Sequence, residues 1–445
     1  MSKDTTYYLE QYDTAADADK FPLVRGWMDT EPLPFFKELR ENRPILVTPG
    51  GTLLARFDDF TEVMDQPKIF TVELYVPKMS NNYLMSHDDD AIHYREKSIM
   101  QGLLNRNDLP KVRALVAKLA NEILDNAKGN LEVVYGYCRS VPAGMVQDYF
   151  GFTGVERKDL IEWSYWAQYD TFHNQPFDLI SDEKRKHISD RHNQTGELLG
   201  KYVGELIVRR LLEVKAEKLE HSVFALWYLL RKQIRKMLGK TSDVLTDNMV
   251  TRMLRTSFPD EVEFDIKRLG TNAGGLLIGS IETTSQCVAQ VIQFLLDRPE
   301  LREQAIKAAA LGDPTEFDGI VWEALRYVPL SPYLFRKVAS EYTVAKGTDR
   351  ATTLKPGTYV LPLVQSAMFD PQAFESPDEF IPSRNWYHYF HFGFGSHECL
   401  GKYVGMVMIP EMVRQVMLRP GIEAQHGIDY KSGPFPEAYQ LAWGK

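Results

Sequence analysis

Residues 392–401 read FGFGSHECLG, and this stretch decides how the rest of the chain is interpreted. It sets one cysteine, Cys399, between glycines where a loop is expected to become a helix over residues 400–418. Gly393 and Gly395 can take positive φ, which lets the backbone approach a flat cofactor. A cysteine at a helix start has the positive helix end and free N–H groups near its sulfur, and these favour the thiolate form that binds iron. The stretch therefore predicts a haem-thiolate site, and the alternative is a buried free cysteine behind a glycine-rich turn.

The same stretch resembles the haem-ligand signature of the cytochrome P450 family, including the histidine two residues before the cysteine. The resemblance implies that Cys399 is the axial ligand of haem b and that Phe392, Gly393, His397 and Gly401 also bind the cofactor. It further implies a mainly α fold of the α+β class, a large helical domain with small β-sheets. In that fold the haem lies between a long central helix and the helix that follows the Cys loop.

Length and composition indicate a single domain over residues 1–445, since no linker interrupts the chain, and residues 1–40 suggest no definite structure. The net charge of −9 argues against bulk affinity for nucleic acid or anionic lipid. The cysteines, Cys138, Cys287 and Cys399, stand far apart, so neither a disulfide framework nor a zinc site is expected, and a reducing cytoplasm fits. Without a signal-peptide pattern or an apolar run of about 18 residues, we expect a cytoplasmic protein with no membrane span.

A second long stretch, residues 264–298, has helical periodicity without a proline and predicts one helix that crosses the whole domain. Inside it stand Gly274, Gly275 and Gly279, each of which costs a helix about 1 kcal/mol relative to alanine. A helix face without side chains lets something bulky lie against the backbone. The alternative is that these glycines serve close packing between helices.

The segment GSIETT at residues 279–284 resembles the oxygen-activation motif of the same family. The resemblance implies that Glu282 and Thr283 deliver protons and a hydrogen bond during oxygen activation. Ser280 departs from the motif, which usually has glycine there. Its hydroxyl is expected to bond the carbonyl four residues back or a water.

Helical geometry indicates where a substrate would lie along this stretch. At 100° per residue, Leu276 and Gly279 share the face of Thr283, and Gly275 lies on the flank beside Gly279. We therefore expect the substrate to contact Gly275, Leu276 and Gly279, while Leu277 points away.

A charged pair precedes the Cys loop. Glu323 and Arg326 lie one helical turn apart and can form a charge-assisted pair, although this spacing alone also fits a solvated pair. Their order before the cysteine resembles the E-x-x-R of the family, and FIPSR at residues 380–384 then names Arg384 as the third member. These three residues are expected to be structural.

Four residues are expected to bind the haem propionates. His93 and Lys97 lie four residues apart and share a helix face, where the alternative is a solvated basic helix. The resemblance implies that both bind propionate, together with Arg336 and His397. Lys97 stands where the family more often has arginine, which changes the strength of that contact.

Periodicity and turn signals place the remaining elements. They predict a hairpin over 44–57, a short helix over 58–65, a loop over 75–86, helices over 88–104, 109–127, 131–149, 157–167 and 182–212, and strands at 336–339, 342–344 and 357–362. In the resembled family, a loop at the position of residues 75–86 covers the substrate.

The resemblance implies a monooxygenase that hydroxylates or epoxidises an apolar organic substrate with O2 and electrons from a partner. The expected donor is a ferredoxin or flavodoxin served by an NAD(P)H reductase, docking on a basic face with Arg95, Lys111 and Lys402. The alternatives are a haem-thiolate peroxygenase or rearrangement enzyme, and a haem sensor without turnover.

Overall fold

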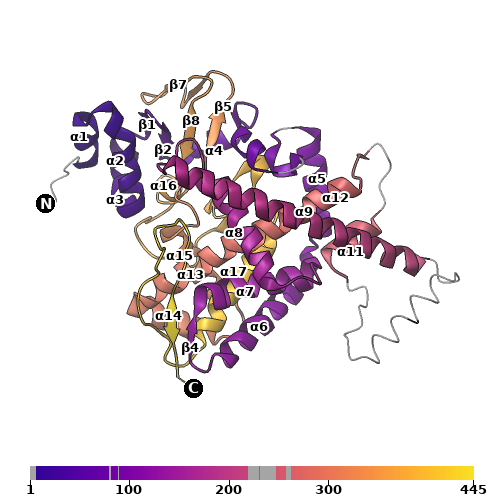
Figure 1. Ribbon diagram of the computed structural model, residues 1–445. Coiled ribbons are helices and arrows are strands. Elements are labelled where there is room, and N and C mark those ends of the chain that lie inside the picture. The colour runs from indigo at the N-terminus through magenta and orange to yellow at the C-terminus, as the bar shows by residue number, and fades with distance from the viewer. Residues whose placement is uncertain are drawn as a thin grey trace.

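The computed structural model describes residues 7–79, 82–88, 90–218, 230, 247–256 and 262–444, and these residues fold mainly into helices with three small sheets (Figure 1). The α-helices of the described residues are α1 (Tyr7–Thr14), α2 (Asp17–Thr30), α3 (Pro32–Asn42), α4 (Phe57–Met64), α5 (Ala91–Leu103), α6 (Leu109–Asn126), α7 (Ser140–Met145), α8 (Arg157–His173), α9 (Asp182–Lys218), α11 (Met249–Arg255), α12 (Ile266–Ser280), α13 (Glu282–Leu296), α14 (Pro299–Ala309), α15 (Thr315–Tyr327), α16 (Val364–Ala367) and α17 (Lys402–Met417). The strands are β1 (Ile45–Thr48), β2 (Gly51–Leu54), β3 (Phe70–Thr71), β4 (Asn130–Glu132), β5 (Arg336–Val338), β6 (Tyr342–Val344), β7 (Thr352–Leu354), β8 (Tyr359–Pro362), β9 (Glu423–Ala424) and β10 (Gln440–Ala442).

The largest sheet has the strand order β1-β2-β8-β5-β3. The hairpin β1–β2 pairs Thr48 with Gly51 at its turn, and β2 then runs parallel to β8. Two smaller sheets have the orders β4-β10-β9 and β6-β7. In Figure 1 the largest sheet lies at one edge of the helical body, beside α4 and above α16.

The core is built around α13. Nearly every side chain of this helix is buried, which is the pattern of a helix enclosed on all sides. It packs against α14, α15 and α17, and in Figure 1 it lies in the middle of the helical body, beside α8 and α17. The helix α17 also packs along α6. The Cys loop thus leads into a helix that is fixed on two sides.

Residues 7–42 fold into three helices, although the sequence suggested no definite structure there. Aromatic rings hold them together, with the ring centroids of Tyr8 and Trp27 5.2 Å apart and those of Trp27 and Phe35 5.1 Å apart. The carboxylate of Glu38 accepts the backbone N–H groups of Tyr8 and Leu9 at 3.1 and 2.8 Å, which satisfies donors at the start of α1. The three helices pack beside the largest sheet.

Most predicted elements are confirmed, and several differ. The segment 131–149 is a short strand followed by α7 between π-helical turns at Val134–Arg139 and Val146–Phe150, rather than one regular helix. The strands β3 and β7 and the helix α14 were not predicted. The helix expected over 264–298 is two helices that meet at Ile281.

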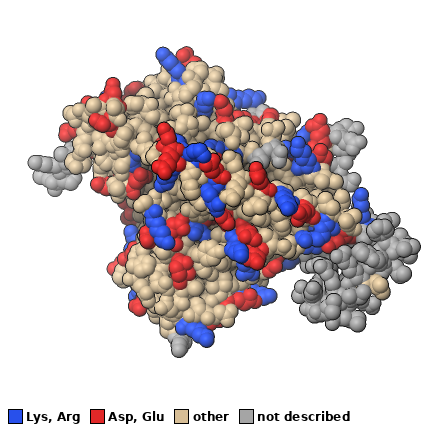
Figure 2. Space-filling view, in the orientation of Figure 1, with Lys and Arg blue, Asp and Glu red and all other residues tan. Residues whose placement is uncertain are grey.

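The surface carries its charges interspersed. On the face shown in Figure 2, basic and acidic side chains alternate along α9 and around it, so the net charge of −9 does not form a single-sign field there. Among the described helices, none combines the length and apolar character that crossing a bilayer demands.

Candidate active site

The Cys loop is shaped by two glycines with positive φ. Gly393 has φ +76° and Gly395 has φ +70°, as the sequence predicted. A Cβ on Gly395 would also lie 2.9 Å from the carbonyl oxygen of Met64, so the loop can pack on α4 only with glycine there. The N–H of Cys399 donates to the Phe392 carbonyl at 2.8 Å, which closes the loop three residues before α17 begins.

The pKa of the Cys399 thiol is shifted in opposite directions by its surroundings. Burial raises its pKa, while the backbone N–H of Gly401 and the ammonium group of Lys97 lower it, and the net shift is upward. The predicted help from the helix start is therefore present but is smaller than the effect of burial. A metal ion that coordinates a thiol deprotonates it outright.

A cavity of about 700 Å³ opens at Cys399. Its wall is mainly apolar and comes from residues 75–79 and 83–85, α8, α9, α12, the start of α13, α15, the segment before β5, the Cys loop and α17. Gly275, Leu276, Gly279 and Thr283 line it, and the buried Leu277 does not. Their contact with a substrate stays a prediction. The cavity joins the cysteine to the helix stretch that resembles the oxygen-activation motif.

The glycines of α12 have different surroundings. A Cβ on Gly279 would meet no atom within 4 Å, so this position faces open space. A Cβ on Gly275 would lie 2.2 Å from the ring of Tyr83, which comes from the loop before α5. The predicted trough is therefore open at Gly279 and covered by an aromatic ring at Gly275.

The two helices meet where the motif lies. Thr283 Oγ1 donates to the Gly279 carbonyl at 2.7 Å. Ser280 Oγ donates to the Leu276 carbonyl, which is the back-bond to the fourth preceding residue that the sequence suggested.

Glu282 turns away from the cavity. Its side chain is fully buried and is held by Arg139, with Nε–Oε2 at 2.7 Å and Nη2–Oε1 at 3.1 Å. Arg139 also contacts Glu437 at 3.3 Å, and Tyr165 donates to Glu437 at 2.8 Å. Burial raises the pKa of Glu282 despite the opposing charge of Arg139.

The residues expected to bind propionates gather beside the Cys loop. The ring nitrogens of His93 lie 2.8 Å from the carbonyl oxygens of Leu84 and Ser396. Lys97 donates to the carbonyls of Ser396 and of Glu398, the latter at 2.6 Å. In this structure both side chains hold the Cys loop, and their contact with a propionate stays a prediction.

His397 and Arg336 both line the cavity. Within the described residues, neither ring nitrogen of His397 has a hydrogen-bond partner, although Nε2 lies 3.8 Å from Asp88 Oδ1. Burial and the nearby charge of Arg336 lower the pKa of His397 to about 2. Arg336 Nη1 donates to the carbonyl of its neighbour Phe335 at 2.8 Å. Buried donors of this kind suit the carboxylates of a haem.

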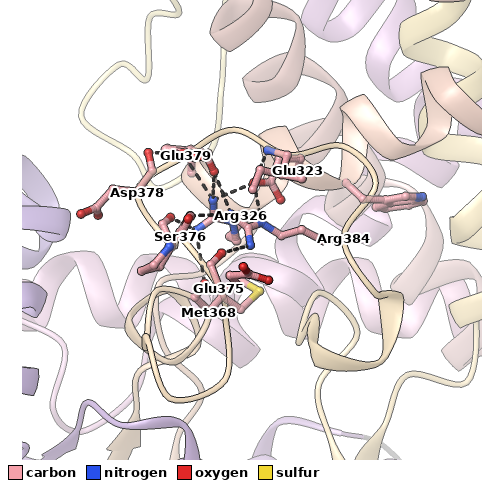
Figure 3. A network of polar contacts seen from close by, with 12 residues as sticks. Glu323, Arg326, Met368, Glu375, Ser376, Asp378, Glu379 and Arg384 are labelled. Carbon is pink, nitrogen blue, oxygen red and sulfur yellow. Dashed lines mark hydrogen bonds and ion pairs between the residues drawn. The ribbon is translucent and has the colours of Figure 1, made fainter.

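Glu323, Arg326 and Arg384 meet in one buried network (Figure 3). Glu323 Oε1 lies 2.7 Å from Arg326 Nη2 and 3.0 Å from Arg384 Nε. Burial alone would raise the pKa of Glu323, but the hydrogen bond and charge of Arg326, with further donors, lower it.

The arginines of this network bind loop carbonyls in addition. Arg326 donates to the carbonyls of Pro377 and Glu379 at 2.6 and 2.9 Å, and Arg384 donates to that of Ser376 at 2.7 Å. Figure 3 shows Ser376 and Glu379 beside the two arginines. The network fixes the irregular segment that precedes the Cys loop.

Comparison with known proteins identifies the family. The family model for cytochrome P450 matches residues 167–429, more than half of the chain. The chain belongs to the cytochrome P450 family. The predicted fold is confirmed, and this P450 is accordingly an oxidoreductase of the haem-thiolate monooxygenase class.

Its relatives are distant but cover nearly the whole chain. The steroid C26-monooxygenase of Mycolicibacterium smegmatis is 23% identical over 422 residues, 92% of this P450 and 90% of the relative. The mycinamicin IV hydroxylase/epoxidase of Micromonospora griseorubida is 23% identical over 409 residues, 87% and 88% of the two chains. The crystal structure of CYP109E1 from Bacillus megaterium in complex with corticosterone has a TM-score of 0.68 at 17% identity and covers 93% of this P450 and 99% of its own chain.

Several residues of the site were not anticipated from the sequence. Arg139 stands in the largely apolar segment 131–149, and a lone arginine in a stretch expected to be central signals a buried partner. Tyr83, and Ser164 of α8, whose hydroxyl donates to the Ile278 carbonyl at 2.8 Å, belong to no motif and carry no such signal. Their positions depend on how distant elements pack.

Proposed function

We propose that this P450 hydroxylates or epoxidises a bulky, mainly apolar molecule of about the size of a steroid. The observation that carries this proposal is the cavity that leads from Cys399 along α12 to α8 and α9, with an open backbone at Gly279. A large apolar pocket with a few polar groups is the usual form of a small-molecule site. The name of one relative, a steroid C26-monooxygenase, and the corticosterone bound to a fold neighbour support the size class.

The cofactor proposed is haem b. Cys399 would be its axial ligand, Phe392, Gly393 and Gly401 would lie against it, and the donors of His397 and Arg336 would bind its propionates, with His93 and Lys97 holding the loop beside them. When bound, such a haem supplies the redox-active iron at which O2 is activated.

Within the protein, Thr283 and Glu282 have the proposed task of moving protons toward the cavity. The hydroxyl of Thr283 lies at the cavity wall, where it can pass a proton or orient a water. Glu282 is next to it in the chain, and its carboxylate is ion-paired with Arg139, which also contacts the partly exposed Glu437. Because Arg139 keeps its proton, a proton from solvent would reach Glu282 only when the carboxylate leaves Arg139.

The proposed electron donor is an acidic ferredoxin or flavodoxin that binds near Arg95, Lys111 and Lys402. Two of these cations have acidic neighbours, Arg95 with Glu263 at 3.3 Å and Lys402 with Glu398 at 2.5 Å. Because such pairs reduce the local field, the salt dependence of reduction should be modest at this face. Reduction rates measured at rising ionic strength test this docking proposal, and rates that rise with salt contradict it.

Spectral titration tests the substrate class. Holoenzyme titrated with steroids and with small aromatic compounds should shift the haem band at micromolar concentrations of the steroids only. A shift with the small compounds alone overturns the size class.

Turnover of Thr283→Ala tests the reaction type. The variant should bind substrate normally and divert electrons from NAD(P)H to peroxide. Unchanged coupling of NAD(P)H use to product contradicts the proposed role of Thr283 and favours peroxide-driven or rearrangement chemistry instead.

A further inference from the structure

Two side chains of α8 enter the junction between α12 and α13. Ser164 Oγ donates to the carbonyl of Ile278 at 2.8 Å, and Gln168 Nε2 donates to the same oxygen at 3.0 Å. The backbone N–H of Glu282 donates to Ser164 Oγ at 3.4 Å. In a continuous α-helix this N–H would donate directly to the Ile278 carbonyl, four residues earlier. The serine hydroxyl therefore stands in the place of one helical hydrogen bond.

The interruption of the helix is local. The N–H of Ser285 donates to the Ile281 carbonyl at 2.9 Å, so the regular pattern resumes directly after the junction. Insertion of a side chain into the hydrogen-bond ladder is a known cause of helix bending. Ser164 and Gln168 are both buried and lie four residues apart, so they share one face of α8. That face is shaped to receive the freed carbonyl.

The same helix also forms part of the cavity wall. Five of its residues line the cavity, namely Trp163, Ala167, Gln168, Thr171 and Phe172. Gln168 thus belongs both to the wall and to the junction. A molecule that fills the cavity would press on the helix whose side chains hold the α12–α13 junction.

We propose that Ser164 and Gln168 are positioning residues for oxygen activation. They keep α12 and α13 apart at Ile281, so that the Glu282 carboxylate points to Arg139 while Thr283 stays at the cavity wall. Through α8 they also link occupancy of the cavity to the geometry of this junction. The inference rests on the proposed roles of Glu282 and Thr283.

Ser164→Ala is the main test, with Ser285→Ala as the matched control. Ser285 lies on α13 one turn after the junction, is buried, and has no hydrogen-bond partner for its hydroxyl within the described residues. Without the inserted hydroxyl, the Glu282 amide should bond directly to the Ile278 carbonyl. Amide hydrogen exchange of a peptide containing Glu282 should then slow roughly two- to tenfold, the range that one added hydrogen bond gives. This readout does not depend on turnover.

Turnover supplies the second readout. Ser164→Ala should increase peroxide formed per NAD(P)H while the dissociation constant from spectral titration stays within twofold, and Ser164→Thr should restore coupling because it retains the hydroxyl. Gln168→Met should act in the same direction more weakly, and it serves as the test if Ser164→Ala yields no folded protein.

Two results overturn the inference. One is that Ser164→Ala, or Gln168→Met in its place, changes neither the amide hydrogen exchange of the Glu282 peptide nor the coupling of NAD(P)H use to product. The other is an equal effect from Ser285→Ala. Thr283→Ala is measured in parallel. If this variant does not uncouple NAD(P)H use from product formation, the proposed role of Thr283 is refuted. That outcome is distinct from a lack of effect of Ser164→Ala.

Discussion

Arg139 and Glu282 face each other as a bidentate ion pair in the protein interior, joined by contacts of 2.7 and 3.1 Å. The pair connects the segment before α7 to the first residue of α13, more than a hundred residues away. Both groups are almost completely buried. If one of them is removed, water cannot solvate the charge of the other.

The first prediction follows from this pair. Arg139→Leu should lower the free energy of unfolding by about 3–5 kcal/mol, since it leaves the carboxylate of Glu282 buried without a partner. The double variant Arg139→Leu/Glu282→Leu should recover a large part of that loss. Urea unfolding of the two variants and the parent measures the effect, and a double variant less stable than Arg139→Leu contradicts it.

The second prediction concerns Arg326, which has no exposed surface and joins Glu323 to the carbonyls of the loop before Cys399. Arg326→Ala should give little folded, haem-loaded protein, because a buried charge and several carbonyls lose their donor. Arg326→Lys should retain more, since it keeps the charge but not the bidentate geometry. Haem content per folded protein is the measurement, and a stable, active Arg326→Ala refutes the structural role.

The third prediction compares two cations at the Cys loop. Arg336→Leu should speed haem loss more than Lys97→Leu does, since Arg336 faces the cavity whereas Lys97 is engaged with the carbonyls of Ser396 and Glu398. Haem transfer to an excess of an apo-haem protein measures both rates. Faster loss from Lys97→Leu would instead assign the larger role to the loop contacts.

The fourth prediction concerns Asp170 on α8. Its carboxylate oxygens lie 2.9 Å from Lys78 Nζ and 2.8 Å from His192 Nδ1. Burial alone would raise the pKa of Asp170, but hydrogen bonds from His192, Lys78 and Asn174 outweigh it and lower the pKa well below its ordinary value. A lowered pKa stabilises the fold above the unfolded-state pKa, near 4, and that contribution is lost as the pH falls toward the folded-state value.

Asp170→Asn should accordingly be less stable than the parent at pH 7, and the difference should shrink as the pH falls below about 4. Urea unfolding at pH 7, 5 and 3 measures it. A difference that grows between pH 5 and pH 3 contradicts the assignment.

The features that could be predicted from the sequence are those encoded in short local motifs. Gly393 and Gly395 have the predicted positive φ, and Glu323, Arg326 and Arg384 meet as the resemblance to the family implied. These features are visible because each motif combines residue type with a short, fixed spacing. The helices follow from periodicity for the same reason, whereas the fold class follows from the resemblance to the family.

What the sequence concealed depends on contacts between distant segments. Periodicity over 264–298 predicts one helix, because the interruption at Ile281 comes from Ser164, more than a hundred residues earlier in the chain. The direction of Glu282 is set by Arg139 in the same way. Nor does helical geometry reveal that Tyr83 covers Gly275, since that ring comes from a loop without a period.

The fifth prediction separates the two glycines of the cavity. Gly279→Phe should keep the fold, because a Cβ there meets no atom within 4 Å, but its ring should exclude substrate and abolish the substrate-induced spectral shift. Gly275→Ala should instead displace Tyr83, whose ring lies 2.2 Å from the added methyl group, and should therefore lower the melting temperature. Tyr83→Ala, made in the Gly275→Ala background, should relieve that clash.

The control for the fifth prediction is Leu277→Ala. Leu277 is fully buried and lies outside the cavity wall, so its truncation should cost about 2–5 kcal/mol of stability without changing the affinity for substrate. Melting temperature, haem-loaded yield and spectral titration are measured for all four proteins. If Gly279→Phe fails to fold, the glycine serves helix packing after all, and if it folds and still binds substrate, the substrate does not lie against α12.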